Sequence, residues 1–298
     1  MPQIAANGIT LEYVSYGPEN AETVLLIMGL GAQMTRWPLP FIQQIVAKGY
    51  RVVTFDNRDV GLSTKFDAAG PADVTAVMAA RMAGQPVATA YTLEDMANDA
   101  AGLLDALKIE RAHIVGASMG GMIAQLVAAN HPDKTLSLVS IMSSTGNPAL
   151  PPAKPEAMAV LMSRPDGSDF KAMVEHAVKS QQVIGSLGYP ADAAALKRQA
   201  IADLNRSTYP VGVSRQMAAI MANGDRRAAL KKIAAPTIVV HGADDPLVPV
   251  EAGRDTAAAI AGAELREIPG MGHDLPAALY GVMVDAIDAA AKRAHATA

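Results

Sequence analysis

The sequence predicts an α/β protein in which helices cover both faces of a mostly parallel sheet. Two observations support this class: short apolar runs typical of strands recur along the chain, and helical patterns alternate with them. The chain has 298 residues, and half of them are hydrophobic, which is enough to bury a large core. We therefore expect the strands to lie side by side in one sheet with helical connections.

Several stretches have the composition expected of strands. Most are continuous apolar runs, as expected where both faces of a parallel sheet are covered. They are Thr10–Tyr16, Thr23–Met28, Arg51–Phe55, Ala112–Val115, Leu136–Ile141, Thr237–His241 and, more weakly, Ala263–Ile268.

Helical patterns lie between these strands. The clearest is Leu93–Leu107, because its apolar residues recur every three or four positions on one face. Thr92 and Asp95 resemble a capping box at its start. Met119–Ala129 and Pro276–Arg293 are the other strong helices.

The alternation of strands and helices stops near Ser143 and resumes at Pro236. The intervening stretch opens with a proline-rich linker and is then rich in alanine, methionine and glutamine, without a convincing strand. We expect an eight-stranded sheet with a helical cap, residues 144–224, inserted after the sixth strand. The core domain would then consist of residues 1–143 and 225–298.

Composition excludes several classes of protein. The 25 basic and 29 acidic residues give a net charge of -4 without a basic cluster, which argues against nucleic-acid and anionic-membrane partners. The absence of cysteine rules out disulfides, thiolate metal sites and a cysteine nucleophile. No secretory signal is visible, and the longest apolar run is too short to span a bilayer. We expect a cytoplasmic protein and leave a homo-oligomer open.

The segment Gly116-Ala-Ser118-Met-Gly120 has the form G-x-S-x-G and lies between a predicted strand and a predicted helix. This is the context of a nucleophile elbow, a tight turn that lifts the serine hydroxyl clear of the sheet. The turn strains the serine backbone, and glycine on either side avoids a steric clash. Ser118 is therefore the predicted nucleophile. A dinucleotide-binding loop is the rival, but the pattern G-x-G-x-x-G is not met.

A serine nucleophile needs a base within hydrogen-bond reach, and the base needs an orienting partner. In chains with such an elbow, the order is serine, then acid, then histidine, each at the carboxyl end of a strand. Asp245 follows the strand that ends at His241. His273 follows the last strand, in a loop flanked by Gly270 and Gly272. We expect His273 to be the base and Asp245 to be its partner.

Alternatives exist for both residues. Asp244 is the other acid, but Pro246 fixes the turn behind Asp245, so we expect Asp244 to be a solvated or capping carboxylate. His241 closes a strand and is expected to be a neighbour of the site. The remaining histidines fit less well, because they lie inside a strand, at a helix end, in the cap or in the tail: His113, His131, His176 and His295.

A serine nucleophile of this kind also requires backbone N–H donors for the oxyanion. Met119, directly after the serine, supplies the first predicted donor. The second is expected in the loop Met28-Gly-Leu-Gly-Ala32. We choose Leu30, because Gly29 lets the chain turn and present the next N–H group.

Five motifs together resemble the α/β-hydrolase superfamily, in its order and spacing, and cover nearly the whole chain outside the cap. They are Met28-Gly-Leu-Gly, Asp56-Asn-Arg-Asp-Val-Gly-Leu-Ser63, Gly116-Ala-Ser-Met-Gly-Gly121, His241-Gly-Ala-Asp-Asp-Pro246 and Gly272-His273. Within the superfamily, the sequence is most similar to the cap-bearing esterases near aclacinomycin methylesterase. That group likewise has Met-Gly where many relatives have His-Gly.

This resemblance implies the α/β-hydrolase fold and a hydrolase that needs no cofactor or metal. It implies a catalytic triad of Ser118, Asp245 and His273 and an oxyanion hole formed by Leu30 and Met119. Met28 departs from the common pattern, because a histidine there would provide a hydrogen-bonding group behind the oxyanion loop. Asp56 and Arg58 are expected to be structural and to brace the loop beside the elbow.

We expect a serine carboxylesterase, similar to the methylesterases, that cleaves small, moderately hydrophobic esters through an acyl-enzyme. Lactonases, cofactor-free perhydrolases and carbon–carbon bond hydrolases use the same triad and are alternatives. Dehalogenases and epoxide hydrolases are disfavoured, because they carry aspartate where this chain has Ser118. A ligand-binding receptor on the same fold is an alternative from another class; it would have an enclosed pocket and almost no turnover.

The chain has 16 methionines and only four phenylalanines, and methionine adapts to irregular apolar space. The candidates for the substrate pocket are Met34, Trp37, Met142, Met217 and Met271. We expect more than half of such residues to pack the core or cap instead. The predicted cap lining carries few charges, which disfavours a highly charged substrate, although Arg164, Lys171 and Arg215 count against this inference.

Overall fold

Eight strands form one sheet in the order β1-β2-β4-β3-β5-β6-β7-β8. The computed structural model describes residues 2–85, 87–163, 165, 167 and 169–296. Strands β3 to β8 pair in parallel, whereas β1 and β2 run antiparallel at one edge. Their bounds are β1 (Gln3–Ala6), β2 (Ile9–Tyr16), β3 (Thr23–Ile27), β4 (Arg51–Phe55), β5 (Ala112–Ala117), β6 (Thr135–Ile141), β7 (Thr237–Gly242) and β8 (Glu264–Ile268).

The predicted fold, an eight-stranded and mostly parallel sheet of the α/β-hydrolase type, is confirmed. The central strands β3, β5 and β7 are buried along their whole length, which explains their continuous apolar runs. The sequence patterns did not reveal β1. Its four residues are mostly exposed at the sheet edge, so they show no apolar run.

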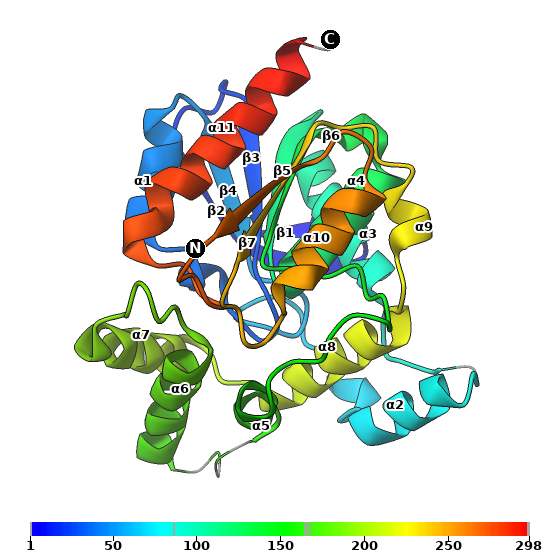
Figure 1. Ribbon diagram of the computed structural model, residues 1–298, viewed down its shortest axis with the longest axis vertical. Helices are drawn as coiled ribbons and strands as arrows, with labels where there is room; N and C mark the ends of the chain where they lie inside the picture. The colour runs from blue at the N-terminus through cyan, green and yellow to red at the C-terminus, as the bar shows by residue number, and fades with distance from the viewer. Residues whose placement is uncertain (1, 86, 164, 166, 168, 297–298) are drawn as a thin grey trace.

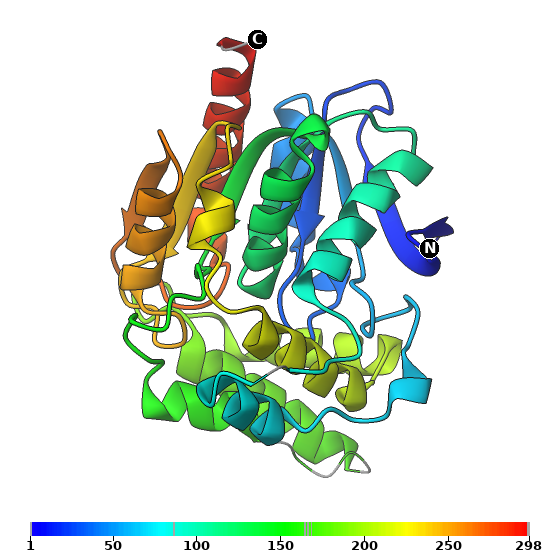
Figure 2. The same ribbon diagram turned by 90° about the vertical axis from the view of Figure 1, so that its right-hand side faces the viewer.

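Helices cover both faces of the sheet (Figures 1 and 2). One apolar cluster lies under α3 and α4, and a second lies under α1 and α11. The predicted capping box of Thr92 and Asp95 is present at the start of α3. The flanking helices are α1 (Leu39–Ala47), α3 (Leu93–Ala106), α4 (Met119–Asn130), α9 (Arg227–Leu230), α10 (Val250–Ala259) and α11 (Tyr280–Ala296).

Four further helices lie together beyond one end of the sheet (Figures 1 and 2). They are α5 (Pro155–Met162), α6 (Phe170–Ile184), α7 (Ala193–Arg206) and α8 (Pro210–Asn223), and all four come between β6 and β7 in the chain. Helix α2 (Val74–Met82), which belongs to the predicted core range, packs against α8. The division into core and cap domains stays a prediction. None of the described helices is both long and apolar enough to cross a bilayer.

Candidate active site

Ser118 occupies the turn between β5 and α4 with φ 57° and ψ −123°, a strained conformation for a residue with a side chain. The neighbouring glycines make this turn sterically allowed. A Cβ on Gly116 would lie 2.0 Å from the carbonyl oxygen of Gly120. A Cβ on Gly120 would lie 2.0 Å from the carbonyl oxygen of Ile27. The strain and the need for glycine follow from the close approach of β3, β5 and α4.

Three side chains from distant parts of the chain meet at the carboxyl ends of the strands. His273 Nε2 lies 2.9 Å from Ser118 Oγ, and His273 Nδ1 lies 2.7 Å from Asp245 Oδ2. The other oxygen of Asp245 accepts hydrogen bonds from the backbone N–H groups of Leu247 and Val248. His273 and Asp245 are buried, so the carboxylate and the imidazole are held in one orientation.

Asp244 and Asp245, the two candidate acids of the sequence analysis, have different hydrogen-bond partners. Asp244 accepts a hydrogen bond from the backbone N–H of Gly270 at 2.7 Å and so caps the loop that carries His273. Asp245 alone of the two contacts the imidazole. Their carboxylates diverge because the turn after β7 directs one toward the loop backbone and the other into the site.

His241 is a buried neighbour of this site. Its Nε2 atom lies 2.7 Å from the carbonyl oxygen of Val248 and 3.8 Å from the Asp245 carboxylate. Burial lowers the pKa of His241, which favours the neutral ring as a hydrogen-bond donor to Val248. His241 therefore supports the turn that carries Asp245. The other histidines lie elsewhere, on β5, at the end of α4, on α6 and on α11.

The loop after β3 runs directly beside the serine. A Cβ on Gly29 would lie 3.1 Å from the Ser118 Cβ and 3.6 Å from its Oγ. The positive φ, 64°, belongs to Gly31 rather than Gly29. The expected turn does begin at Gly29, since the N–H of Ala32 donates to the carbonyl oxygen of Gly29 at 3.2 Å, but glycine at position 29 itself is explained by the close approach to Ser118. The N–H groups of Leu30 and Met119 remain the predicted oxyanion donors.

Two side chains that sequence reasoning missed brace this loop on either side of Leu30. Asn57 donates a hydrogen bond to the carbonyl oxygen of Met28 at 2.9 Å. The N–H of Gly31 donates to Gln216 Oε1 at 2.8 Å, and Gln216 is fully buried on α8. Asn57 thereby supplies hydrogen bonding behind the loop although Met28 replaces the common histidine. No sequence pattern signals Gln216, because its partners lie more than 150 positions away.

The Asp56 and Arg58 side chains brace the loop after β4, as expected. Asp56 is fully buried and accepts hydrogen bonds from the backbone N–H groups of Met34 and Leu62. Arg58 forms two hydrogen bonds with Asp99 on α3, at 2.6 and 2.7 Å. These contacts anchor the loop between β4 and α2 to the backbone at Met34 and to α3.

A second buried ion pair joins the same loop to α8. Arg215 contacts both carboxylate oxygens of Asp59, at 2.7 and 2.8 Å, and both side chains are almost fully buried. Burial by itself raises the pKa of Asp59, but hydrogen bonds from Arg215, Phe66 and Tyr91 outweigh it and lower the pKa below its ordinary value. Asp59 is therefore charged at neutral pH and holds α8 against the core.

The end of α6 and the segment that follows it contact the backbone of the His273 loop. The N–H of His273 donates to the carbonyl oxygen of Ile184 at 2.7 Å. Ser186 Oγ accepts a hydrogen bond from Gly272 N–H at 2.8 Å and bonds to the carboxyl group of Asp274. Burial raises the pKa of Asp274. The segment is thus held to the loop that carries the imidazole, a contact that no sequence signal indicated.

All five candidate pocket residues are buried: Met34, Trp37, Met142, Met217 and Met271. Trp37, Met142 and Met271 belong to the apolar cluster under α1 and α11, so packing accounts for them, and their role in binding stays a prediction.

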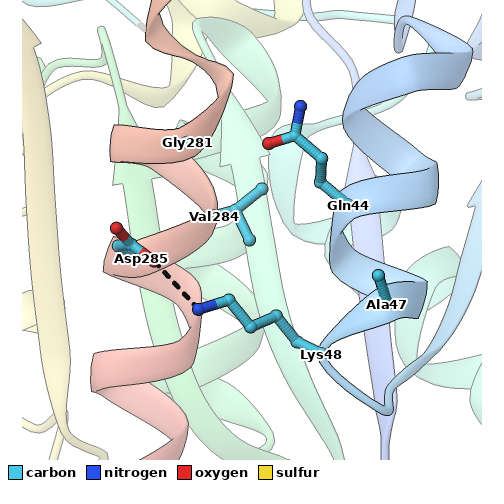
Figure 3. A pocket seen from close by; sticks show the side chains of 6 residues that line it. All are labelled: Gln44, Ala47, Lys48, Gly281, Val284 and Asp285. Carbon is cyan, nitrogen blue, oxygen red and sulfur yellow. Dashed lines mark hydrogen bonds and ion pairs between the residues drawn. The ribbon is translucent and has the colours of Figure 1, made fainter.

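Two surface hollows of the described chain are lined by none of the predicted site residues. One, of about 260 Å³, lies between α1 and α11 and is bridged by Lys48 and Asp285 (Figure 3). The other, of about 610 Å³, lies beside α3.

Comparisons with known proteins agree with this geometry. Residues 22–276 match the family of the α/β hydrolase fold. The chain is 27% identical to rhodomycin D methylesterase DauP of Streptomyces sp. (strain C5), over 95% of each chain. It is 30% identical to 2-hydroxy-6-oxononadienedioate/2-hydroxy-6-oxononatrienedioate hydrolase of Paraburkholderia xenovorans (strain LB400), over 89% of this chain and 84% of that protein.

A solved structure shows the same fold. The enol-lactonase from Burkholderia xenovorans LB400 superposes with a TM-score of 0.74 and 24% sequence identity, over 98% of this chain and 100% of that one. This likeness shows that the two chains share one fold.

Proposed function

This chain belongs to the α/β hydrolase fold family and is a hydrolytic enzyme, and from that premise we propose that it hydrolyses carboxylic esters through an acyl-enzyme on Ser118. The observation that carries the proposal is the continuous hydrogen-bonded path from Ser118 through His273 to Asp245. The similarity of this chain to a methylesterase, over 95% of both chains, supports an ester as the substrate.

The reaction proceeds in two halves. Ser118 Oγ attacks the ester carbonyl carbon while His273 Nε2 takes the hydroxyl proton. The protonated imidazole then gives this proton to the leaving alcohol, and the acyl-enzyme remains. A water molecule, deprotonated by His273, attacks the acyl carbon. The tetrahedral intermediate releases the carboxylic acid, and the proton returns from His273 to Ser118.

The Asp245 carboxylate and two backbone N–H groups assist these steps. The Asp245 carboxylate holds the imidazole with Nδ1–H toward it and stabilises the imidazolium that forms in each half-reaction. The N–H groups of Leu30 and Met119 stabilise the oxyanion. Helices α5–α8, within residues 144–224, act as the cap over the substrate.

The charges near the site favour a neutral, moderately hydrophobic ester. Two cap arginines already pair with buried core carboxylates, Arg206 with Asp56 at 2.8 Å and Arg215 with Asp59. Lys171 is exposed, and Arg164 lies outside the described residues. Because both arginines already neutralise buried carboxylates of the protein, they do not provide a binding site for a substrate carboxylate.

Carbon–carbon bond hydrolysis is the second candidate, because the 30% identical relative is named for a hydroxy-oxo-dienedioate substrate. That substrate carries two carboxylates, whereas the buried arginines near the site are already paired. We therefore rank it below ester hydrolysis.

A substrate panel tests the proposal. Purified protein is assayed on p-nitrophenyl esters of graded acyl length, a methyl ester, a lactone and a hydroxy-oxo-dienoate. We expect the neutral esters to give the highest kcat/KM. Ser118→Ala is expected to lower kcat by about 10⁶-fold, because the nucleophile is lost. Undiminished turnover by this variant contradicts the mechanism, and preferred cleavage of the dienoate contradicts the substrate class.

The contact between Ser186 and the His273 loop leads to a further expected result. Ser186→Ala removes the acceptor of Gly272 N–H and leaves a buried donor unpaired, at a cost of about 1–3 kcal/mol. We expect kcat to fall by about tenfold because the His273 loop loses a support. Ser180→Ala is the matched control, since the Ser180 hydroxyl donates to the backbone carbonyl oxygen of His176, within its own helix. Equal kcat values for the two variants would contradict this positioning role.

A further inference from the structure

A cluster of two histidines and a glutamate lies at the end of the sheet opposite to Ser118. Glu22 immediately precedes β3, and His113 is the second residue of the neighbouring strand β5. His295 lies in the last turn of α11, at the end of the molecule opposite to α5–α8 (Figure 1). Along β5, five residue steps lead from His113 to Ser118, which corresponds to roughly 16 Å of extended chain. The cluster is therefore separate from the proposed active site.

The three side chains converge with their donor atoms. His113 Nε2 lies 3.2 Å from Glu22 Oε2, and His295 Nε2 lies 2.8 Å from the same oxygen. One ligand atom from each residue lies within 4.8 Å of the other two. Ligands of a tetrahedral zinc ion, at about 2.0–2.1 Å from the metal, lie about 3.4 Å apart. The cluster thus needs only small movements of its side chains to surround one ion.

The burial of the three ligands suits such a movement. His113 is fully buried and fixed, whereas the side chains of Glu22 and His295 are 44% and 54% exposed. The two exposed side chains can adjust around an ion that the buried imidazole anchors. Their exposure also gives the ion a path from solvent and leaves room for water as a further ligand.

His113 has the outer hydrogen bond that orients metal-binding histidines. Its Nδ1 atom lies 2.9 Å from the hydroxyl of buried Ser137, and Tyr50 packs edge-on against the ring. When Nδ1–H donates to Ser137, the lone pair of Nε2 points toward Glu22 and His295.

We propose that Glu22, His113 and His295 form a binding site for a divalent transition metal of the zinc type. Two imidazole nitrogens and one carboxylate are a donor set that Zn²⁺ prefers. The bound ion would join the end of α11 to β3 and β5, elements that are far apart in the chain. Because it stabilises only the folded state, the metal would raise the melting temperature.

Calorimetric titration of the metal-free full chain with ZnCl₂ near pH 7.5 tests the site. We expect one ion per chain and, at about 100 times Kd, a rise in melting temperature of about 5 °C. His295→Ala and Glu22→Gln are each expected to weaken the binding of Zn²⁺ by about 10- to 100-fold. His295 lies in an exposed terminal turn, so we expect its replacement to leave the fold intact, and circular dichroism checks this.

A matched control removes a histidine outside the cluster. His131→Ala replaces a histidine whose partner is Asn98, and it should leave the affinity for Zn²⁺ unchanged. The measured affinity for Zn²⁺ does not depend on ester hydrolysis, so the proposed metal site and the proposed function are tested independently. The proposal is overturned if no single-site binding is found, or if His295→Ala binds Zn²⁺ as tightly as the wild-type chain.

Discussion

Asp245→Asn is expected to lower kcat for ester hydrolysis by about 10⁴-fold while the protein remains folded. The asparagine has nearly the same shape, but it cannot hold His273 in the tautomer that accepts the serine proton, nor can it stabilise the imidazolium. The contact that would be lost is the 2.7 Å hydrogen bond between Asp245 Oδ2 and His273 Nδ1. Steady-state kinetics on a p-nitrophenyl ester, with circular dichroism as a check of folding, measures the effect.

The neighbouring acid provides the matched control for this prediction. Asp244→Asn keeps an oxygen that accepts the hydrogen bond from Gly270 N–H, and Asp244 has no contact with the imidazole in the described structure. We expect its kcat to stay within about threefold of the wild-type value, because only a capping interaction is weakened. A larger loss in Asp244→Asn than in Asp245→Asn would reverse the assignment of the acid.

Arg215→Met is expected to destabilise the protein by about 3–5 kcal/mol, because it leaves the carboxylate of Asp59 buried without its partner. Arg215 forms two hydrogen bonds with that carboxylate and also contacts the Gly70 carbonyl oxygen and the Tyr209 hydroxyl. Methionine replaces the volume of the side chain without its charge. Urea unfolding followed by circular dichroism measures the change in the free energy of unfolding.

Two further variants identify the buried charge as the cause. Arg227→Met removes a partly exposed arginine that pairs with Asp225 and, at 4.0 Å, with Asp255, and it should leave the free energy of unfolding unchanged within error. Adding Asp59→Asn to Arg215→Met removes the unpaired charge and should recover part of the lost stability. Equal destabilisation by Arg215→Met and Arg227→Met would contradict this explanation.

The ion pair of Arg215 and Asp59 also makes the free energy of unfolding depend on pH. The pKa of Asp59 is lowered in the folded wild-type protein, so its stabilising effect is present above the ordinary pKa and is lost as pH falls through the lower, folded value. Without Arg215, burial raises the pKa of Asp59, and the folded variant gains stability by binding a proton as pH falls. The difference in unfolding free energy between the wild-type protein and Arg215→Met should therefore become smaller from pH 7 toward pH 4.

The sequence by itself determined those features that depend on residues close together in the chain. Continuous apolar runs indicated the buried strands, and the capping box marked the start of α3. The elbow could also be predicted from the local pattern G-x-S-x-G, because the clash that requires Gly116 lies within the turn, although the clash that requires Gly120 comes from Ile27 on the neighbouring strand β3. The edge strand β1 was missed, because a mostly exposed strand of four residues carries almost no pattern.

Only the tertiary structure decided which distant groups meet. Asp244 and Asp245 are adjacent in the chain, and the direction of the turn after β7 separates a loop cap from the partner of His273. Gln216 and Ser186 brace the Leu30 and His273 loops from elements whose packing no local pattern encodes. The physical reason is that local patterns reflect steric and solvation constraints on neighbouring residues, whereas partner choice depends on how whole elements pack.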